Sequence, residues 1–253
     1  MPGRLHHLGR TLLIALPSCT VDKTRISGKA LKNQVQTLLE SNDREPALER
    51  LCRLPPRKVV NPLFSFLYHS DQEIRWAAVE AMGLVVARLA DEDMESARVV
   101  MRRLMWNLND ESGGIGWGSP EALGAIMARH EGLAKEYAHI LMSYTRKDGN
   151  YLEHEILQRG LLWGIGRLAE VRPRLLRDAG HHLLPYLRSP DAAVRVLAAR
   201  AAAILGIASV RPSLLELAED HAPVVTYTQG KVGHLRVADL AKEALERLDR
   251  HDC

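Results

Sequence analysis

IRWAAVEAMG, residues 74–83, is the segment that decides the fold, because variants of it return along the chain at nearly constant intervals. The related segments end at positions 83, 124, 166, 206 and 246. In the second of them, IGWGSPEALG, Trp117 and Glu121 stand where the first has Trp76 and Glu80. A spacing of about 40–47 residues is typical of two-helix solenoid repeats.

Each of these segments follows another amphipathic stretch, so that one unit reads as helix, turn, helix. In ARVVMRRLMWNLND, for example, Val99, Leu104 and Leu108 recur at helical spacing. A unit of this kind cannot bury its apolar face alone and needs stacked neighbours. We therefore expect an all-α, right-handed α-α superhelix, a solenoid of about five two-helix repeats.

The same spacing predicts the domain organisation. The repeats are expected at about 57–90, 94–129, 132–169, 173–207 and 212–249, within a single domain over 29–253. Residues 29–56 indicate an N-terminal helical cap, and residues 1–28 a disordered tail, since termini are commonly untied. In the last repeat, β-rich VVTYTQ and VGHLRV flank Gly-Lys, which predicts a small hairpin at about 223–237 on the loop edge of the solenoid.

The segment that begins at Asp71 has the pattern Asp-x-x-(Val or Ile)-Arg, followed by small residues and then by an apolar residue and glycine. This pattern resembles the HEAT-repeat family, and most of all the bacterial HEAT-like repeats of phycobilisome (PBS) lyases. The residues that carry the resemblance are Asp71, Ile74, Arg75, Ala78, Ala81, Met82 and Gly83, and then Asp191, Val194, Arg195, Ala198, Ala199 and Ala201. It covers about residues 45–248, although the glycine register slips by three residues in the later segment.

The resemblance implies architecture rather than function. In the family, the Asp and Arg form a ladder between adjacent repeats, which implies structural roles for Asp71, Arg75, Asp191 and Arg195. Glycines close most of the related segments, at Gly83, Gly124, Gly166 and Gly206. We expect these glycines to permit close helix crossing or to end a helix.

The turn DESGGIGWGSP, residues 110–120, departs from its counterparts in the other repeats. It contains neither GxGxxG nor GK[ST] and follows a helix pattern instead of a strand, which excludes the common nucleotide-binding loops. We expect Ser119 to cap the next helix and Pro120 to occupy its first position. Two interpretations stay open: the turn only accommodates Trp117 and close packing, or its glycine amides form a concave recognition surface.

The next repeat has its own enlarged turn, residues 145–160. Because the two turns occupy equivalent places in adjacent repeats, we expect them to lie side by side along one edge. The predicted binding surface consists of Glu111, Gly113, Gly114, Gly116, Trp117, Tyr151, Glu153, His154 and Glu155. A solvated helix start is the alternative reading of Glu153–Glu155, because adjacent residues diverge on a helix and do not make a metal site.

Two groups of ring-bearing residues are also notable in the sequence. The four tryptophans are Trp76, Trp106, Trp117 and Trp163. They either pack in the core or form a shared aromatic patch, in which tryptophan is a favoured hot-spot residue. His181 and His182 are adjacent on an expected helix and should face different ways.

Composition limits the function. The net charge is only +3, which is weak for nucleic-acid binding, and three distant cysteines argue against a disulfide framework and for a reducing cytoplasm. The sequence contains no run of about 18 apolar residues, the length that a membrane-spanning helix needs. We expect a non-enzymatic, cytoplasmic scaffold or adaptor that binds another protein, with no catalytic residues, metal or cofactor; a small-molecule ligand stays open.

Two alternatives to the scaffold remain. The first is a bilin-lyase-like or cofactor-chaperone activity, as the resemblance implies, with Glu153–Glu155 as the source of a general base. The second is DNA binding as in HEAT-like glycosylases, for which Arg102 and Arg103 are the local basic residues.

Overall fold

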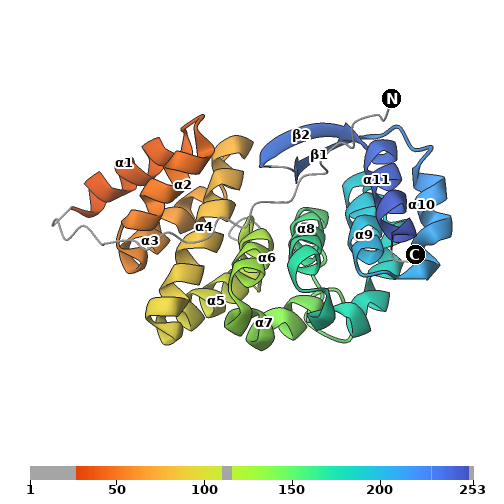
Figure 1. Ribbon diagram of the computed structural model, residues 1–253, viewed down its shortest axis with the longest axis horizontal. Helices are drawn as coiled ribbons and strands as arrows, with labels where there is room; N and C mark the ends of the chain where they lie inside the picture. Colours follow the sequence, from red (N-terminus) through yellow and green to blue (C-terminus); the bar gives the residue numbers. More distant parts are fainter. Residues whose placement is uncertain (1–26, 110–115, 229, 251–253) are drawn as a thin grey trace, which may run out of the picture.

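The computed structural model describes residues 27–109, 116–228 and 230–250, and Figure 1 shows an arch of stacked helix pairs. One row of helices runs through the arch: α4 (Gln72–Glu92), α6 (Ser119–Arg129), α8 (Glu155–Val171), α9 (Ala192–Ile204) and α11 (Val237–Asp249). The outer row consists of α3 (Pro56–Phe66), α5 (Met94–Leu108), α7 (Glu131–Ser143), the 3-10 helix η2 (Arg177–Arg188) and α10 (Arg211–Leu217). Inner helices pack on one another in order and on their outer partners. The predicted all-α solenoid of two-helix repeats is confirmed.

An N-terminal helix pair precedes the repeats. α1 (Gly28–Leu39) and α2 (Arg44–Arg53) pack on each other and against α3 and α4. The hydroxyl of Ser27 caps α1 by accepting a hydrogen bond from the amide of Ala30 at 3.2 Å. The predicted tail, residues 1–28, therefore overlaps the start of α1 at Ser27 and Gly28, and residues 1–26 lie outside the described residues.

One apolar core runs through the repeats. Its fully buried side chains include Leu63 of α3, Met82 of α4, Leu104 of α5, Ile126 of α6 and Leu161 of α8. The inner helices lie between neighbours on several sides, so most of their residues are buried. Alanine and glycine suit these helices because small side chains let adjacent backbones approach.

Aspartates begin two of the inner helices. Asp71 accepts hydrogen bonds from the amides of Glu73 at 2.8 Å and Ile74 at 3.2 Å, and Asp191 accepts one from Val194 at 2.9 Å. These carboxylates satisfy amides that have no partner inside the helix.

Glycine faces glycine where α6 crosses α8. A methyl group on Gly124 would come within 2.7 Å of the carbonyl carbon of Gly164, closer than real side chains approach. Gly166 differs, because the nearest atom to such a methyl group is the Cβ of Ala201 at 3.9 Å. Gly206 follows α9 with a φ of 73°, a left-handed conformation that favours glycine.

Charged side chains connect the later repeats. The Nε of Arg159, from α8, lies 3.1 Å from an oxygen of Asp191, and Arg195 of α9 donates to Asp220 at 2.7 Å. Arg75 instead lies over the ring of Trp76, 5.8 Å from its centroid, and forms no ion pair with another described residue. Of the four residues to which the resemblance implies structural roles, Asp191 and Arg195 thus each pair with a charged residue of an adjoining repeat.

The outer helix of the fourth repeat departs from the expected α-helix. It is the 3-10 helix η2, preceded by the short 3-10 helix η1 (Pro173–Leu175), and it contains Pro185, which cannot donate a backbone hydrogen bond. The prediction that His181 and His182 face different ways is wrong. Their ring centroids are 3.9 Å apart, so the two imidazoles contact each other in the 3-10 helix. Burial, and then the neighbouring His181, lower the pKa of His182.

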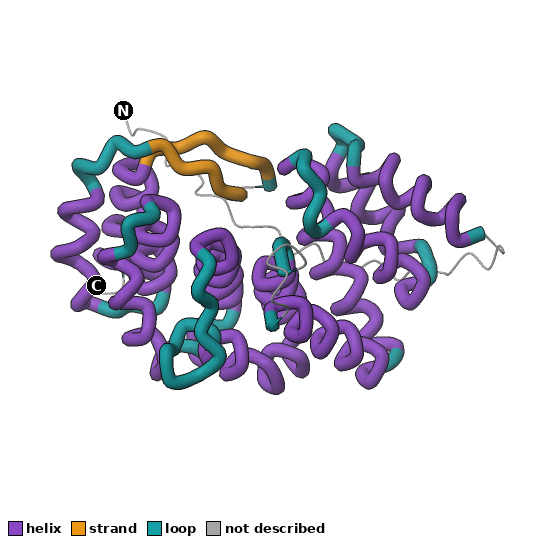
Figure 2. The backbone as a smooth tube through the Cα atoms, turned by 180° about the vertical axis from the view of Figure 1, so that it is seen from behind, coloured by secondary structure: helices purple, strands orange, loops and turns teal. Residues whose placement is uncertain are grey.

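The predicted hairpin is present as β1 (Pro223–Thr228) and β2 (Lys231–Arg236), paired antiparallel. The hairpin is not confined to the loop edge of its own repeat. The hairpin leaves the last repeat and crosses to α4 of the first, as Figures 1 and 2 show, and it also contacts α9 and α11. Its Tyr227 ring stacks on Trp76 at 4.9 Å, while the indole of Trp163 donates to the Tyr227 carbonyl at 2.8 Å.

Candidate functional site

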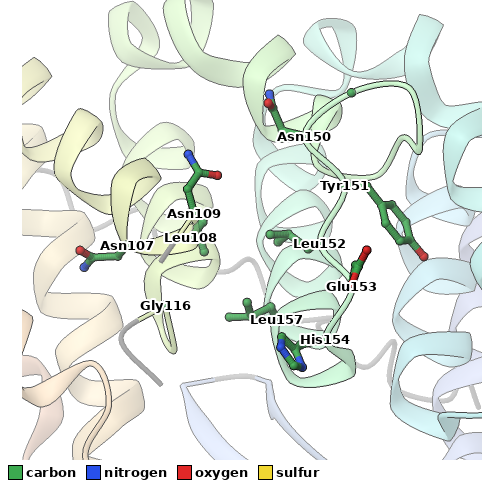
Figure 3. A pocket seen from close by; sticks show the side chains of 11 residues that line it. Asn107, Leu108, Asn109, Gly116, Asn150, Tyr151, Leu152, Glu153, His154 and Leu157 are labelled. Atoms are coloured by element: carbon green, nitrogen blue, oxygen red, sulfur yellow. The ribbon is translucent and has the colours of Figure 1, made fainter. Parts of the chain in front are cut away.

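A pocket of about 370 Å³ opens between the end of α5 and the turn that leads into α8 (Figure 3). We call it the turn pocket. Its buried apolar side chains are Leu108, Leu152 and Leu157. Its polar side chains are Asn107, Asn109, Asn150, Glu153 and His154. The remaining lining residues are Gly116, Gly149 and Tyr151. The pocket therefore combines an apolar base with amide and ionisable groups.

The two enlarged turns meet at this pocket. Gly116 comes from the glycine-rich turn, and residues 149–154 come from the turn of the next repeat. Of the predicted surface, Tyr151, Glu153 and His154 also line the pocket, while Glu155 is the first residue of α8 and does not. Trp117 follows Gly116 but is not a lining residue, and the remaining predicted members, Glu111, Gly113 and Gly114, lie outside the described residues.

A network of hydrogen bonds holds the second turn in place. The buried amide of Gln158 donates to the carbonyl of Leu152 at 2.8 Å, and the side-chain amide of Asn150 donates to the Ser143 hydroxyl at 2.8 Å. The hydroxyl of Tyr186, from η2, donates to the carbonyl of Thr145 at 3.1 Å. Because these bonds anchor the turn at both ends, the residues that line the pocket are held on a defined backbone.

The glycine-rich turn enters α6 through Gly118. Its φ of 76° is left-handed, and a side chain there would come within 2.9 Å of the Cβ of Leu67. Gly118, and not Ser119, is the N-cap, so the predicted cap is wrong. The left-handed glycine turns the chain directly into the helix and places Ser119 inside its first turn. The Ser119 hydroxyl is fully buried and has no hydrogen-bond partner among the described residues.

Two exposed tryptophans adjoin residues of the turn pocket in sequence. Trp106 precedes Asn107 in α5 and is 75% exposed, and Trp117 follows Gly116 and is 36% exposed. An exposed tryptophan leaves a large apolar surface in contact with water, which is unfavourable. Tryptophan is also enriched among the residues that anchor protein interfaces. Each of the two segments that supply the pocket thus carries an exposed tryptophan adjacent in sequence to a lining residue.

The other two tryptophans are buried together. Trp76 of α4 and Trp163 of α8 lie 4.7 Å apart between ring centroids, and Tyr227 of the hairpin packs against both. The predicted equivalence of Trp76 and Trp117 is therefore wrong, because Trp117 precedes its helix while Trp76 lies inside one. The tryptophans divide into a packed pair and an exposed pair, not one shared patch.

Charge in the turn pocket is mostly uncompensated. Asp148, next to the lining residues, pairs with Arg146 at 2.6 Å, and this hydrogen-bonded partner lowers the pKa of Asp148. Glu153 and His154 form no ion pair with any described residue. Across the described part of the chain, no three His, Cys, Asp or Glu residues are grouped to hold a metal ion. No described helix is long and apolar enough to cross a bilayer.

A buried carboxylate lies close behind the exposed turn. Glu121, in the first turn of α6, packs against Gly160 of α8, and one of its oxygens has no hydrogen-bond partner among the described residues. Burial raises the pKa of Glu121 above its usual 4.5, and the charge of Arg75 only partly opposes this. The folded chain thus binds a proton at Glu121 more tightly than the unfolded chain does.

Glu121→Gln is expected to stabilise the protein at neutral pH and to remove part of its pH dependence. Since the folded-state pKa is raised, the contribution of Glu121 is fully present below pH 4.5 and is lost as pH rises through the folded-state value. Denaturant unfolding of both proteins from acid to neutral pH checks this. A gap in unfolding free energy that stays constant with pH would show that Glu121 does not titrate differently in the two states.

Sequence reasoning did not identify several residues of the site. Asn107, Asn109 and Asn150 line the turn pocket, but an isolated asparagine in a turn or helix end gives no periodic signal. Their clustering depends on how α5 and α8 stack. The hydrogen bond from Gln158 to the carbonyl of Leu152 could likewise not be predicted, because it forms only when the turn packs on α8.

This architecture defines a class: the chain is a helical-repeat solenoid with a side pocket at its turns and a hairpin across its repeats. No family model matches the sequence. An uncharacterized protein of Archaeoglobus fulgidus is 28% identical over 205 residues, which cover 78% of this chain and 98% of that protein. An engineered protein from a structural genomics consortium is similar with a TM-score of 0.48, 17% identity and coverage of 87% and 96% of the two chains. A designed armadillo repeat protein in complex with the peptide (KR)4 is similar with a TM-score of 0.47, 19% identity and coverage of 86% and 99%.

Proposed function

We propose that this solenoid is a scaffold that holds a segment of another protein in the turn pocket. The observation that carries the proposal is the pocket itself, with its apolar base, three asparagine amides and unpaired Glu153. The exposed Trp106 and Trp117 adjoin it in sequence. Gly116, Trp117, Tyr151, Glu153 and His154 are the predicted surface residues that this function uses.

The chemistry of the pocket favours an extended segment that carries a basic residue. An asparagine amide offers both a donor and an acceptor, which matches the alternating groups of a peptide backbone. Glu153 is the carboxylate among the lining residues, so it favours a cationic side chain. The buried leucines would receive an apolar neighbour in the segment.

The two alternatives from the sequence gain less support from the same geometry. A lyase-like or cofactor-chaperone activity needs a positioned base, but Glu153 and His154 are exposed and no described residue orients them. For DNA binding the sequence offers Arg102 and Arg103, but Arg102 pairs with Glu95 and Arg103 is a single cation stacked on Phe64, whereas DNA binding needs several unpaired cations on one face. The resemblance to PBS lyases therefore informs the fold and not the proposed activity.

An affinity capture with three baits tests the proposed function. The baits are the full chain, a Trp117→Ala variant, and a Leu175→Ala/Leu215→Ala variant. The last removes two exposed apolar side chains, 37% and 56% exposed, at a distance in sequence from the pocket. We expect the tryptophan variant to lose a specific partner by at least about tenfold, since interface hot spots often contribute more than ~1.4 kcal/mol.

The leucine variant should retain that partner, and circular dichroism should show that all three baits keep their helices. Equal capture by the three baits would place binding elsewhere on the solenoid. Equal loss in both variants would show that exposed apolar area in general, and not the turn pocket, causes capture.

A further inference from the structure

A second pocket, of about 210 Å³, lies between α3 and α5. Its apolar lining includes Val60, Phe64 and Leu89, all buried, and Val99 stands exposed beside them. This is smaller than the ~300–1,000 Å³ of pockets that enclose a drug-sized ligand. It suits one apolar side chain, presented between two helices. We call it the helix pocket.

The charge at the helix pocket is not balanced. Arg57 pairs with Asp93, so these two cancel. The guanidinium of Arg103 lies over the Phe64 ring, 3.9 Å from its centroid, and donates to the side-chain oxygen of Asn61 at 2.7 Å. Among the residues that the structure describes, no carboxylate forms an ion pair with Arg103. A cation is thus held in place by stacking and one hydrogen bond, with its charge open to a ligand.

We propose that the helix pocket binds a peptide segment in which an apolar side chain adjoins a carboxylate. The apolar side chain fills the space over Val60 and Phe64, and the carboxylate pairs with Arg103. Residues 1–26 of the chain contain Val21 beside their single acid Asp22, but Lys23 and Arg25 follow at once and the segment carries a net positive charge, which Arg103 would repel. The occupant is therefore a segment of a partner protein, and this proposal does not rest on the turn pocket.

The exposed face of α5 extends from the helix pocket. Val99, Arg103 and Trp106 are spaced by four and three residues, so they lie on one face of the helix. Val99 is 53% exposed, and none of the three lies in the apolar core. A partner segment in the helix pocket would therefore find apolar surface on α5 to cover.

A methyl NMR titration of the full chain tests the proposal. The probes are the capped peptides acetyl-Glu-Leu-Gly-amide and acetyl-Gln-Leu-Gly-amide, which differ only in charge. We expect saturable shifts of the Val60, Val99 and Val100 methyl signals at millimolar peptide. The Glu probe should bind about two- to fivefold more tightly, the range of a partly exposed ion pair.

Two variants isolate Arg103. Arg103→Gln should abolish the preference for the Glu probe, while Arg102→Gln should retain it, because Arg102 pairs with Glu95 and does not line the pocket. Absence of saturable shifts, or a preference that survives Arg103→Gln, would overturn the proposal. It would also be overturned if the same methyl signals shifted on concentrating the protein alone, because the pocket would then hold a second copy, whose exposed Leu215 adjoins Glu216.

Discussion

Gly124→Ala is expected to lower the free energy of unfolding by about 2–3 kcal/mol, the cost of overpacking a close-packed interior. Alanine normally favours a helix over glycine, so propensity alone predicts the opposite sign. The added methyl group would meet backbone atoms of Gly164, 2.7 Å from its carbonyl carbon, and backbone cannot rotate away as a side chain can. α6 and α8 would have to separate along their crossing.

Gly166→Ala is the matched control, because this glycine lies in the adjoining helix α8 and an added methyl group would meet the Cβ of Ala201 at an ordinary contact distance of 3.9 Å. It should raise the free energy of unfolding by about 0.5–1 kcal/mol through helix propensity. Denaturant unfolding followed by circular dichroism measures both variants. Equal effects of the two substitutions would mean that α6 and α8 do not cross as closely as described.

Tyr227→Ala is expected to be the most damaging change in the hairpin, with a cost of about 3–5 kcal/mol, as for other buried aromatic-to-alanine replacements. The Tyr227 ring packs against Trp76 of α4 and Trp163 of α8, with 4.9 and 6.1 Å between ring centroids. Its loss would leave both indoles next to a void and would release the hairpin. Tryptophan fluorescence should therefore shift to longer wavelength in the folded variant.

Two controls distinguish the effect of losing the Tyr227 ring from the effect of any substitution in β1. Val225→Ala removes a side chain that is 42% exposed on the same strand and should cost less than about 1 kcal/mol. Tyr227→Phe keeps the ring and should keep the fluorescence of the parent. If Tyr227→Ala left both stability and emission unchanged, the hairpin would not be docked on the first and third repeats.

The physical importance of Tyr227 lies in which repeats it joins. In a solenoid each repeat contacts its neighbours only, so its ends are coupled weakly. The hairpin contacts α4 although it is part of the last repeat, and so it links parts of the chain about 150 residues apart. We expect loss of this link to weaken cooperativity as well as stability.

The helical repeats were predictable because their signal is local and periodic. Asp71 and Asp191 cap helices where the Asp-x-x-(Val or Ile)-Arg pattern places them, and the glycines at 124 and 206 permit a close crossing and a helix end. The hairpin was predictable from its β-rich strands. Its docking was not, because Trp76 and Trp163 lie far from Tyr227 in the sequence, and no local pattern indicates that they meet.

The location of the candidate site could be predicted better than the residues that line it. Two enlarged turns in adjacent repeats indicated one edge, and Gly116, Tyr151, Glu153 and His154 do line one pocket there. The asparagines and the buried leucines were not predicted, because they form a pocket only when α5 and the turn before α8 pack together. Ser119 was misassigned because a cap residue and a first-turn residue look alike when Gly118 adopts a left-handed conformation.

The most direct test of the scaffold proposal is backbone hydrogen exchange of the full chain, alone and with the partner that the unmodified bait captures. We predict slower exchange at residues 107–109 and 149–157, which form the turn pocket, and unchanged exchange over α10, residues 211–217. Protection over α10 or the hairpin, with residues 107–109 and 149–157 unchanged, would contradict the proposal that the turn pocket holds the partner.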